Sequence, residues 1–225
     1  MKLKQLLIAT FFSTFLFATA QAGSLGFGVT GGLIGVSADG TETEGTSGSE
    51  TETNQSATAG NTGMFGEVYG EYSFGDSERL TLGVAYVPGS VDINNKTLSR
   101  TDASQDGYTA QDTGTVKANA EISDHTTYYA ELLLGAGIYL KAGYSEVDIA
   151  VKQSNASGYG TYPDKTLDAT TLGIGYKGEW GDNGIYKLEG FTSDYDSYSA
   201  TSTTSNTVKA DLDVIGAKFS LGFKF

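Results

Sequence analysis

The last twelve residues, 214–225, read VIGAKFSLGFKF and carry the strongest fold signal in the chain. Alternate positions counted back from Phe225 are all apolar, whereas the interleaved positions are mostly small or cationic and include Lys218 and Lys224. Successive side chains of a strand point to opposite faces, so this stretch predicts a two-faced β-strand. Such a strand can close a membrane barrel with its apolar face toward lipid, or it can cover the core of a soluble β-protein.

The amino-terminal segment has the three parts of a secretory signal peptide. Two lysines precede an apolar run at residues 6–17, and Ala20-Gln21-Ala22 offers a small-x-small cleavage site. The run is shorter than the roughly 20 residues that a membrane-spanning helix needs. We therefore expect residues 1–22 to be removed on export and the mature protein to begin at Gly23.

Composition narrows the class of protein further. The 225 residues include 27 acidic and 14 basic side chains, which gives a formal charge of −13 and argues against nucleic-acid binding through phosphate contacts. There is no cysteine, so disulfides and thiolate metal sites are excluded. The 31 glycines, 14 tyrosines and 11 phenylalanines favour an all-β chain.

Eight two-faced segments follow one another along the mature chain, and their connections alternate in length. Long polar stretches at about 37–62, 90–114, 153–166 and 194–207 alternate with short turns at 75–78, 135–137 and 181–184. Outer-membrane barrels have an even number of strands, short periplasmic turns and long extracellular loops, whereas a soluble Greek-key sandwich has no reason to place every short turn at one end. The sequence therefore predicts an eight-stranded antiparallel up-and-down transmembrane β-barrel over residues 23–225, located in the cell outer membrane.

Two local features interrupt this regular pattern. Pro88-Gly89 predicts a bend or the end of regular strand pairing, because proline cannot donate to a ladder. After Glu146 the apolar positions change parity, to Val147, Ile149 and Val151. Either a bulge or the exit of the strand from the membrane would cause that change.

Charged residues on the polar faces of the strands form a candidate site inside the barrel. The set is Glu67, Glu71, Arg79, Glu131, Lys141, Lys177, Lys187, Glu189 and Lys218. The interior of an eight-stranded barrel is only wide enough for side chains, and unpaired buried charge is costly. We expect these groups to pair and fill the lumen; a charged pore or gate is the alternative. Glu131 and Lys141 flank one short turn and are the predicted cross-strand pair, which a Glu131→Lys, Lys141→Glu swap should preserve.

The terminal strand and the repeated strand–turn–strand pattern resemble those of a known group of proteins. They are similar to the small eight-stranded outer-membrane β-barrels of Gram-negative bacteria, of the OmpA/OmpX-like and opacity-type porin superfamily. The resemblance is architectural and covers the whole mature chain. It implies a monomer in contact with outer-membrane lipids and lipopolysaccharide. It also implies that the barrel assembly machinery reads the last strand, a role that would fall to Phe219, Leu221, Phe223 and Phe225.

A structural or surface-display role without catalysis or cofactor is the leading expectation for function. The alternative is a narrow channel or a lateral route for small solutes, as in OmpW-like barrels. An outer-membrane lipid-modifying enzyme is a remote alternative, because Ser123, Asp124 and His125 supply a nucleophile, an acid and a base. On a regular strand, however, Ser123 and His125 share a face that Asp124 opposes.

The acidic loops raise one more hypothesis, the binding of divalent cations through carboxylate oxygens. The candidates are Asp102, Asp106 and Asp112, or the acids at positions 42–52. Their spacing matches no EF-hand, and Ser/Thr-rich acidic tracts are usually only solvated. We therefore predict no metal site.

Overall fold

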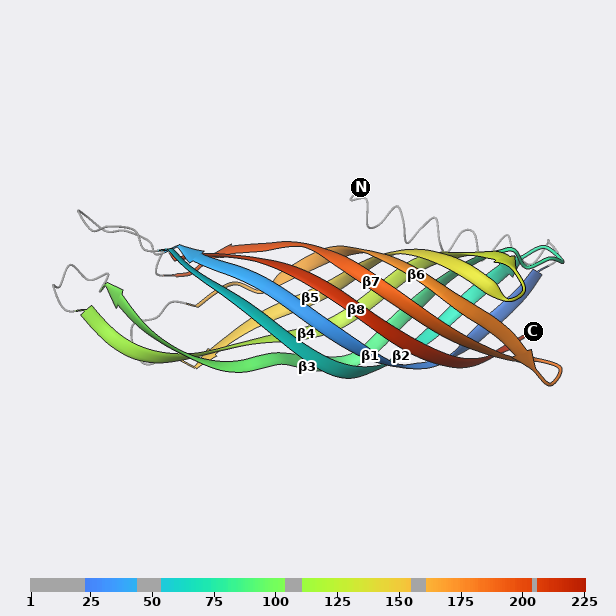
Figure 1. Cartoon of the computed structure of the whole chain (residues 1–225), viewed down its shortest axis with the longest axis horizontal. Helices are drawn as coiled ribbons and strands as arrows, with labels where there is room; N and C mark the ends of the chain where they lie inside the picture. The colour runs from blue at the N-terminus through green and yellow to red at the C-terminus, as the bar shows by residue number, and fades with distance from the viewer. Residues whose placement is uncertain (1–22, 44–53, 104–110, 155–160, 204–205) are drawn as a thin grey trace.

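A computed structural model describes residues 23–43, 54–103, 111–154, 161–203 and 206–225. Within these ranges, eight antiparallel strands form a closed barrel in which each strand pairs with its neighbours in sequence and β8 pairs with β1 (Figure 1). The strands are β1 (Gly23–Thr43), β2 (Asn54–Phe74), β3 (Leu80–Ala103), β4 (Gln111–Gly135), β5 (Ile138–Ser154), β6 (Lys165–Trp180), β7 (Gly184–Thr201) and β8 (Thr207–Lys224). The predicted eight-stranded up-and-down barrel is confirmed. No helix in the described ranges is long and apolar enough to cross a membrane.

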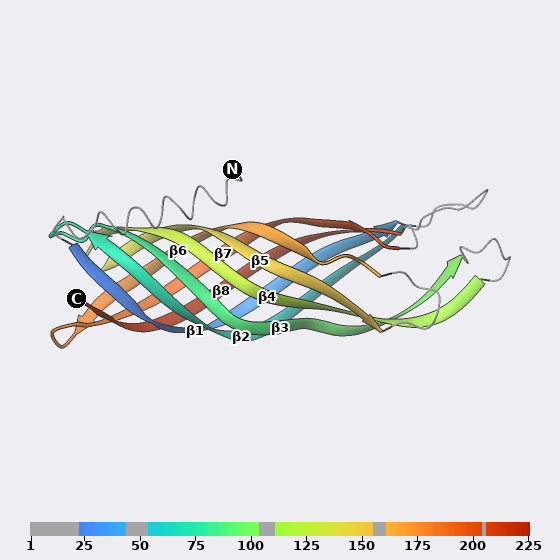
Figure 2. The ribbon, with the colours of Figure 1, turned by 180° about the vertical axis from the view of Figure 1, so that it is seen from behind.

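One end of the barrel carries the three tight turns, and we call it the turn end (Figures 1 and 2). Gly137 and Gly181 have φ angles of 81° and 60°, which glycine adopts without the steric cost of a Cβ. The carboxyl terminus is fixed at the same end by two backbone hydrogen bonds between Leu25 and Phe225, of 3.0 and 2.9 Å. Short turns lie on the periplasmic side of outer-membrane barrels, so the opposite end is extracellular.

An apolar band surrounds the half of the barrel next to the turn end. Its side chains point outward and are exposed on the isolated chain, which is the arrangement that lipid requires. The band includes Leu25, Phe27, Val29, Leu33, Met64, Val68, Leu80, Leu132, Leu140, Leu172, Ile174, Leu188, Ile215, Phe219 and Leu221. Aromatic pairs mark its edge at the turn end: Tyr72–Phe74, Tyr176–Tyr186 and Trp180–Phe223, with ring centroids 4.9, 6.1 and 5.5 Å apart. A closed barrel with this belt is an outer-membrane barrel.

The strands run far past the apolar band into the stretches that the sequence suggested were loops. The predicted loop bounds at 37–62, 90–114 and 194–207 are wrong, because β1 continues to Thr43, β2 begins at Asn54, and β3, β4 and β7 extend into the other two stretches. The predicted loop at 153–166 agrees with the strand bounds to within two residues, since β5 ends at Ser154 and β6 begins at Lys165. Polarity was the misleading signal. Neighbouring strands satisfy the backbone, and only the inward positions have to be buried. Residues 44–53, 104–110, 155–160 and 204–205 of the predicted loops lie outside the described residues.

The chemistry of the two barrel faces inverts above the apolar band. On β5, Val147 and Ile149 lie on the same inward side as Lys141, with exposed fractions of only 1% and 7%, while Asp148 faces solvent. Pairing of β5 with β6 is uninterrupted from Ile138 to Ile149. The parity change after Glu146 is therefore the exit of the strand from the membrane and not a bulge on β5. The extracellular half is built like a soluble barrel, polar outside and apolar inside.

The wall of this extracellular half is open between β2 and β3. The two strands pair only from Val68↔Tyr86 to Phe74↔Leu80; beyond this point β2 pairs with β1 alone and β3 with β4 alone. Pro88 lacks an N–H, Gly89 has a φ of 92°, and the register with β4 shifts directly after Val87. The bend predicted at Pro88-Gly89 is confirmed. Both views show β1–β2 and β3–β4 splaying apart here (Figures 1 and 2), and we call this opening the seam.

Candidate functional site: the charged lumen and the pocket above it

Eight charged side chains of alternating sign run in one chain through the lumen inside the apolar band. They come from β2, β4, β5, β6, β7 and β8. In order they are Lys177, Glu71, Lys187, Glu131, Lys141, Glu189, Lys218 and Glu67, and the successive N···O distances are 3.8, 2.5, 2.8, 3.9, 3.4, 3.5 and 3.3 Å. We call this set the ion chain. It contains four carboxylates and four ammonium groups, so its formal charge is zero.

The ion chain is shielded from solvent and supported by tyrosines. Each of its members except Lys177 has a side-chain exposure of 8% or less. The Tyr129 hydroxyl donates a hydrogen bond of 2.8 Å to Glu71, and the Tyr139 hydroxyl donates one of 2.9 Å to Glu189. The Lys141 ammonium also lies 3.8 Å from the centre of the Tyr129 ring, where a cation–π interaction is favourable. These contacts offset part of the desolvation of the charges.

The structure places eight of the nine predicted lumen charges inside the barrel and Arg79 outside it. Arg79 is exposed, and the prediction for it is wrong. Pairing of β3 begins at Leu80↔Phe74, so Arg79 still belongs to the turn and the inward–outward alternation does not extend to it. Without Arg79, the set of four acidic and five basic residues becomes four of each, with no net charge.

The predicted pair Glu131–Lys141 is opposite in register, but it is not the dominant contact of either residue. Their charged atoms are 3.9 Å apart, whereas Glu131 lies 2.8 Å from Lys187 and Lys141 lies 3.4 Å from Glu189. The register of β4 against β5 predicts only that Glu131 and Lys141 are partners. The closer partners reach across the lumen from β7, which a strand-by-strand reading of the sequence does not bring together.

Two tyrosines of the lumen, Tyr129 and Tyr139, have a role that the sequence did not predict. Tyr129 lies over Gly83 and Tyr139 lies over Gly175, each its register partner on a neighbouring strand. A Cβ at either glycine would come within 2.2 to 2.4 Å of the ring, so only glycine leaves room for it. The pattern in the sequence that could have indicated this packing is a tyrosine opposite a glycine on the inward faces of neighbouring strands.

A second, smaller charge cluster closes the turn end. Lys224 lies 3.3 Å from Glu78, and Glu78 accepts a hydrogen bond of 2.7 Å from the Ser24 hydroxyl. Burial raises the pKa of the Glu78 carboxyl, but the Ser24 hydrogen bond and the Lys224 charge outweigh it and hold that pKa below its ordinary value of 4.5. Lys224 also contacts Glu179 at 2.5 Å.

A belt of hydroxyl groups separates the ion chain from the space above it. Thr127, Ser145, Thr171 and Ser193, from β4, β5, β6 and β7, are buried and linked by O···O distances of 2.8, 3.3 and 2.7 Å. Hydroxyls can act as donor and acceptor at once, so the belt satisfies itself without charge. It marks the level at which the lumen changes from ionic to neutral.

A cavity of about 110 Å³ lies directly above this belt, and we call it the lumen pocket. Its floor includes Glu67, Lys218 and three residues of the hydroxyl belt, Thr127, Thr171 and Ser193. Its walls are largely apolar and come from Ile34, Val36, Phe65, Val87, Ile122, Phe191, Tyr195 and Val214, with His125 among them. Phe65 and Val87 belong to the two strands that border the seam, so the pocket reaches the opening in the wall.

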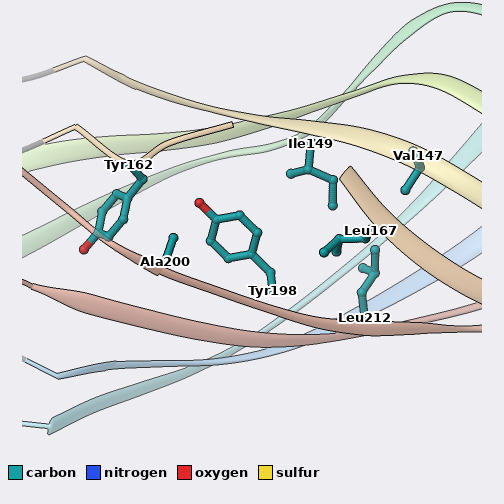
Figure 3. Packing of buried hydrophobic residues seen from close by; sticks show 7 residues of the cluster. All are labelled: Val147, Ile149, Tyr162, Leu167, Tyr198, Ala200 and Leu212. Atoms are coloured by element: carbon teal, nitrogen blue, oxygen red, sulfur yellow. The ribbon is translucent and has the colours of Figure 1, made fainter. Parts of the chain in front are cut away.

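The lumen above the pocket is filled by an apolar cluster, opposite the seam. Val147, Ile149, Tyr162, Leu167, Tyr198, Ala200 and Leu212 point toward one another from β5 to β8 and from the segment before β6 (Figure 3). Tyr162 donates a hydrogen bond of 2.7 Å to Glu42, and Tyr198 donates one of 3.0 Å to the Pro163 carbonyl. The pocket is therefore bounded by the ion chain on the periplasmic side and by this cluster on the extracellular side.

His125 does not form the arrangement of a hydrolase triad. Its Nε2 lies 3.0 Å from the Tyr195 hydroxyl, inside the pocket wall. An irregularity of β4 between Ser123 and Thr126, with Asp124 at a φ of 51°, breaks the alternation, so Ile122 and His125 both line the pocket. Asp124 points outward and accepts a hydrogen bond of 3.1 Å from Tyr86. The expected shared face of Ser123 and His125 is therefore wrong.

The other predicted sites have plain outcomes. Phe219, Leu221, Phe223 and Phe225 point outward and are 44–68% exposed, so they are available to lipid, and their role in assembly stays a prediction. Among the described residues, no group of three or more His, Asp or Glu side chains could hold a metal ion. Of the proposed acidic-loop sites, the side chains of Asp102, Asp106, Asp112 and the acids at 44–52 lie outside what the structure describes, and Glu42 accepts the hydrogen bond from Tyr162.

Comparison with known proteins gives similarity of fold only. No family model matches the sequence, and no curated protein matches it. Similar solved structures include the outer membrane protein OprG from Pseudomonas aeruginosa, with 13% identity, a TM-score of 0.40 and coverage of 91% of this chain and 97% of that one. The outer membrane protease OmpT from Escherichia coli has 8% identity, a TM-score of 0.42 and coverage of 90% and 97%. Ail of Yersinia pestis has 10% identity, a TM-score of 0.33 and coverage of 88% and 99%. The assignment to an outer-membrane barrel rests on the apolar band and the closed strand pairing.

Proposed function

We propose that the protein is a non-catalytic, non-conducting outer-membrane barrel that supports membrane integrity and displays its extended extracellular half at the cell surface. The observation that carries this proposal is the ion chain. It is neutral, almost fully buried and drawn from six of the eight strands. An ion crossing the lumen would have to separate charges that have no water to replace their partners, which costs several kcal/mol for each carboxylate or ammonium.

The outer surface supports the display part of this proposal. The strands continue well above the apolar band, and their outward residues there are polar, such as Asp39, Thr58 and Asp213. We propose that the band contacts outer-membrane lipids and lipopolysaccharide, that the barrel is a monomer, and that the aromatic residues of the last strand are read by the barrel assembly machinery.

Single-channel recording in planar bilayers tests the closed state. The purified barrel should give no stable, discrete conductance over a range of voltages. A Lys187→Ala, Glu131→Ala variant, which empties the centre of the ion chain, is the matched positive control and should show intermittent current. Stable conductance steps from the unmodified protein would overturn the proposal.

A second function, a lateral route for small apolar solutes, is favoured by one observation. The lumen pocket has apolar walls and a floor of hydroxyl groups beside the Glu67–Lys218 ion pair, is closed along the barrel axis on both sides, and borders the seam. The lower end of the seam, Val68↔Tyr86, lies within the apolar band, at the level of the outer leaflet. A small solute with an apolar ring and one hydroxyl group would fit such a pocket.

Titration with p-cresol, followed by NMR, tests this second function. The chemical shifts of His125 and Phe65 should change saturably with p-cresol concentration. In Phe65→Trp these changes should be smaller, because the larger side chain occupies the pocket. Shifts that grow linearly with concentration and spread over the whole apolar band would indicate partition into detergent and would exclude a site.

A further inference from the structure

The edge of β2 that faces the seam has no partner strand within the described chain. From Asn54 to Glu67, β2 is paired with β1 on one side only. An open edge offers a row of backbone donors and acceptors to any extended peptide, and proteins usually protect such edges with lysine, proline or a bulge. The stretch NQSATAGNTGMFG, residues 54–66, contains no charged residue and no proline. Its pairing with β1 shows no bulge.

We propose that this β2 edge binds an extended peptide by strand addition, with apolar residues of the peptide facing the lumen pocket and cationic residues facing outward. The proposal rests on the display role proposed above and names the class of partner. In strand addition the backbone supplies affinity and pockets for alternate side chains supply specificity.

The lumen pocket suits the inward side chains of such a peptide. Asn61, Gly63 and Phe65 lie at alternate positions of the β2 edge, and all three line the pocket. An added strand would point its alternate side chains into the same space. The cavity of about 110 Å³ has room for one large apolar side chain against Phe65 and Val87.

The outer wall beside the edge explains the preference for cations. A shallow groove crosses the outside of β1 and β2 at Gly35, Gly60 and Thr62, and it leads to Asp213 on β8. Asp213 is directly opposite Asp194, and Asp39 is directly opposite Asp211. Asp39 on β1 is the register partner of Thr58 on β2, so it lies two strand spacings, about 10 Å, from a strand added beside β2, whereas Asp213 on β8 lies three spacings away. Opposed like charges destabilise a sheet, so an outward lysine or arginine that extends over β2 toward Asp39 would relieve its repulsion with Asp211.

A second copy of the chain in the same membrane is a poor occupant of the edge. It would bring the same acidic outer face, with Asp39 and Asp213, against its own counterpart. The charge of the whole chain, −13, adds to that repulsion. The occupant is therefore an extended cationic peptide that approaches from the extracellular side.

The test uses the full protein folded in zwitterionic detergent micelles and a fluorescent eight-residue peptide that alternates valine and lysine. Saturable binding by fluorescence anisotropy is expected, together with slower amide hydrogen exchange within residues 60–66. Two control peptides, one with a central valine replaced by proline and one that alternates valine and glutamate, should each bind about tenfold or more weakly, a difference of about 1.4 kcal/mol.

Matched variants separate edge binding from general charge attraction. Asp39→Asn should weaken binding of the valine–lysine peptide several-fold, whereas Asp182→Asn, in an exposed turn at the other end of the barrel, should leave it unchanged. Absence of saturable binding, equal binding of the proline peptide, or exchange protection outside β2 would overturn the proposal. None of these results would bear on the proposed non-conducting role, which the bilayer recordings test independently. Binding of p-cresol without binding of the peptide would favour the lateral route and overturn the strand-addition proposal.

Discussion

Replacing Lys187 by methionine should destabilise the barrel by about 3–5 kcal/mol, the usual cost of removing one partner from a buried ion pair. The Lys187 ammonium lies 2.5 Å from Glu71 and 2.8 Å from Glu131, in a position where its side chain is only 4% exposed. Without it, Glu71 keeps the Tyr129 hydroxyl at 2.8 Å and Lys177 at 3.8 Å, and the cation left to Glu131 among the described residues is Lys141 at 3.9 Å. Methionine has a similar volume, so lost charge and not a cavity should dominate the change.

The free energy of unfolding can be measured by urea titration in lipid vesicles, with the fluorescence of Trp180, the only tryptophan, as the probe. Adding Glu131→Gln to Lys187→Met returns the ion chain to neutrality and should recover about half of the loss or more. Lys209→Met, at an exposed position on β8, is the control and should change stability by no more than about 0.5 kcal/mol. A Lys187→Met variant within about 1 kcal/mol of the parent would refute the idea that the buried charges depend on one another.

Three further predictions follow from the same contacts. The Glu131→Lys, Lys141→Glu swap should fail to restore the stability lost in Glu131→Lys, because it sets the new glutamate against Glu189 and the new lysine against another lysine; full recovery in urea titrations would show that the pair is isolated after all. Arg79→Ala should leave the free energy of unfolding and the conductance unchanged, since the side chain is exposed outside the lumen. A loss of stability above about 1 kcal/mol would indicate that Arg79 does pair with the charges of the ion chain. Glu78→Gln should cost stability at pH 7, and its difference from the parent should shrink as pH falls from 4.5 through the lower folded pKa of Glu78; a difference that grows on acidification would contradict the assigned direction.

The fold was predictable because outer-membrane barrels leave a strong pattern in sequence. The alternation in residues 214–225 and the regular exchange of long and short connections were enough to predict eight strands and the lipid-facing side of each. The same alternation assigned all nine charges to the inside, and the structure places eight of them there. Arg79 was lost because a turn breaks the alternation one residue before pairing begins.

The extracellular half was much harder to predict. Its polar outer positions look like loop, and only the structure shows that inward residues such as Val36 and Leu212 pack into a core. The parity change at Val147 is visible in the sequence, but a bulge and the exit of the strand from the membrane explain it equally well. Continuous pairing of β5 with β6 was needed to decide between them.

Contacts across the lumen were beyond the reach of sequence patterns. Alternation states which side chains face inward, but it does not state which of them meet. The approach of Lys187 to Glu71 and Glu131 depends on barrel closure and strand stagger, which place β7 opposite β2 and β4. The seam likewise required knowledge of where β2 and β3 stop pairing, although Pro88-Gly89 indicated a bend.

The most direct test of a filled, charge-paired lumen is the NMR signal of the lysine side-chain ammonium groups in the folded protein at neutral pH. Buried ammonium groups held by carboxylates exchange their protons with water slowly, whereas exposed ones exchange too fast to be seen. We predict persistent ¹⁵Nζ signals for Lys141, Lys187 and Lys218, and the loss of the Lys187 signal alone in Lys187→Met. If none of these three lysines gave an exchange-protected signal, the lumen would be hydrated and the account of a closed barrel would be contradicted.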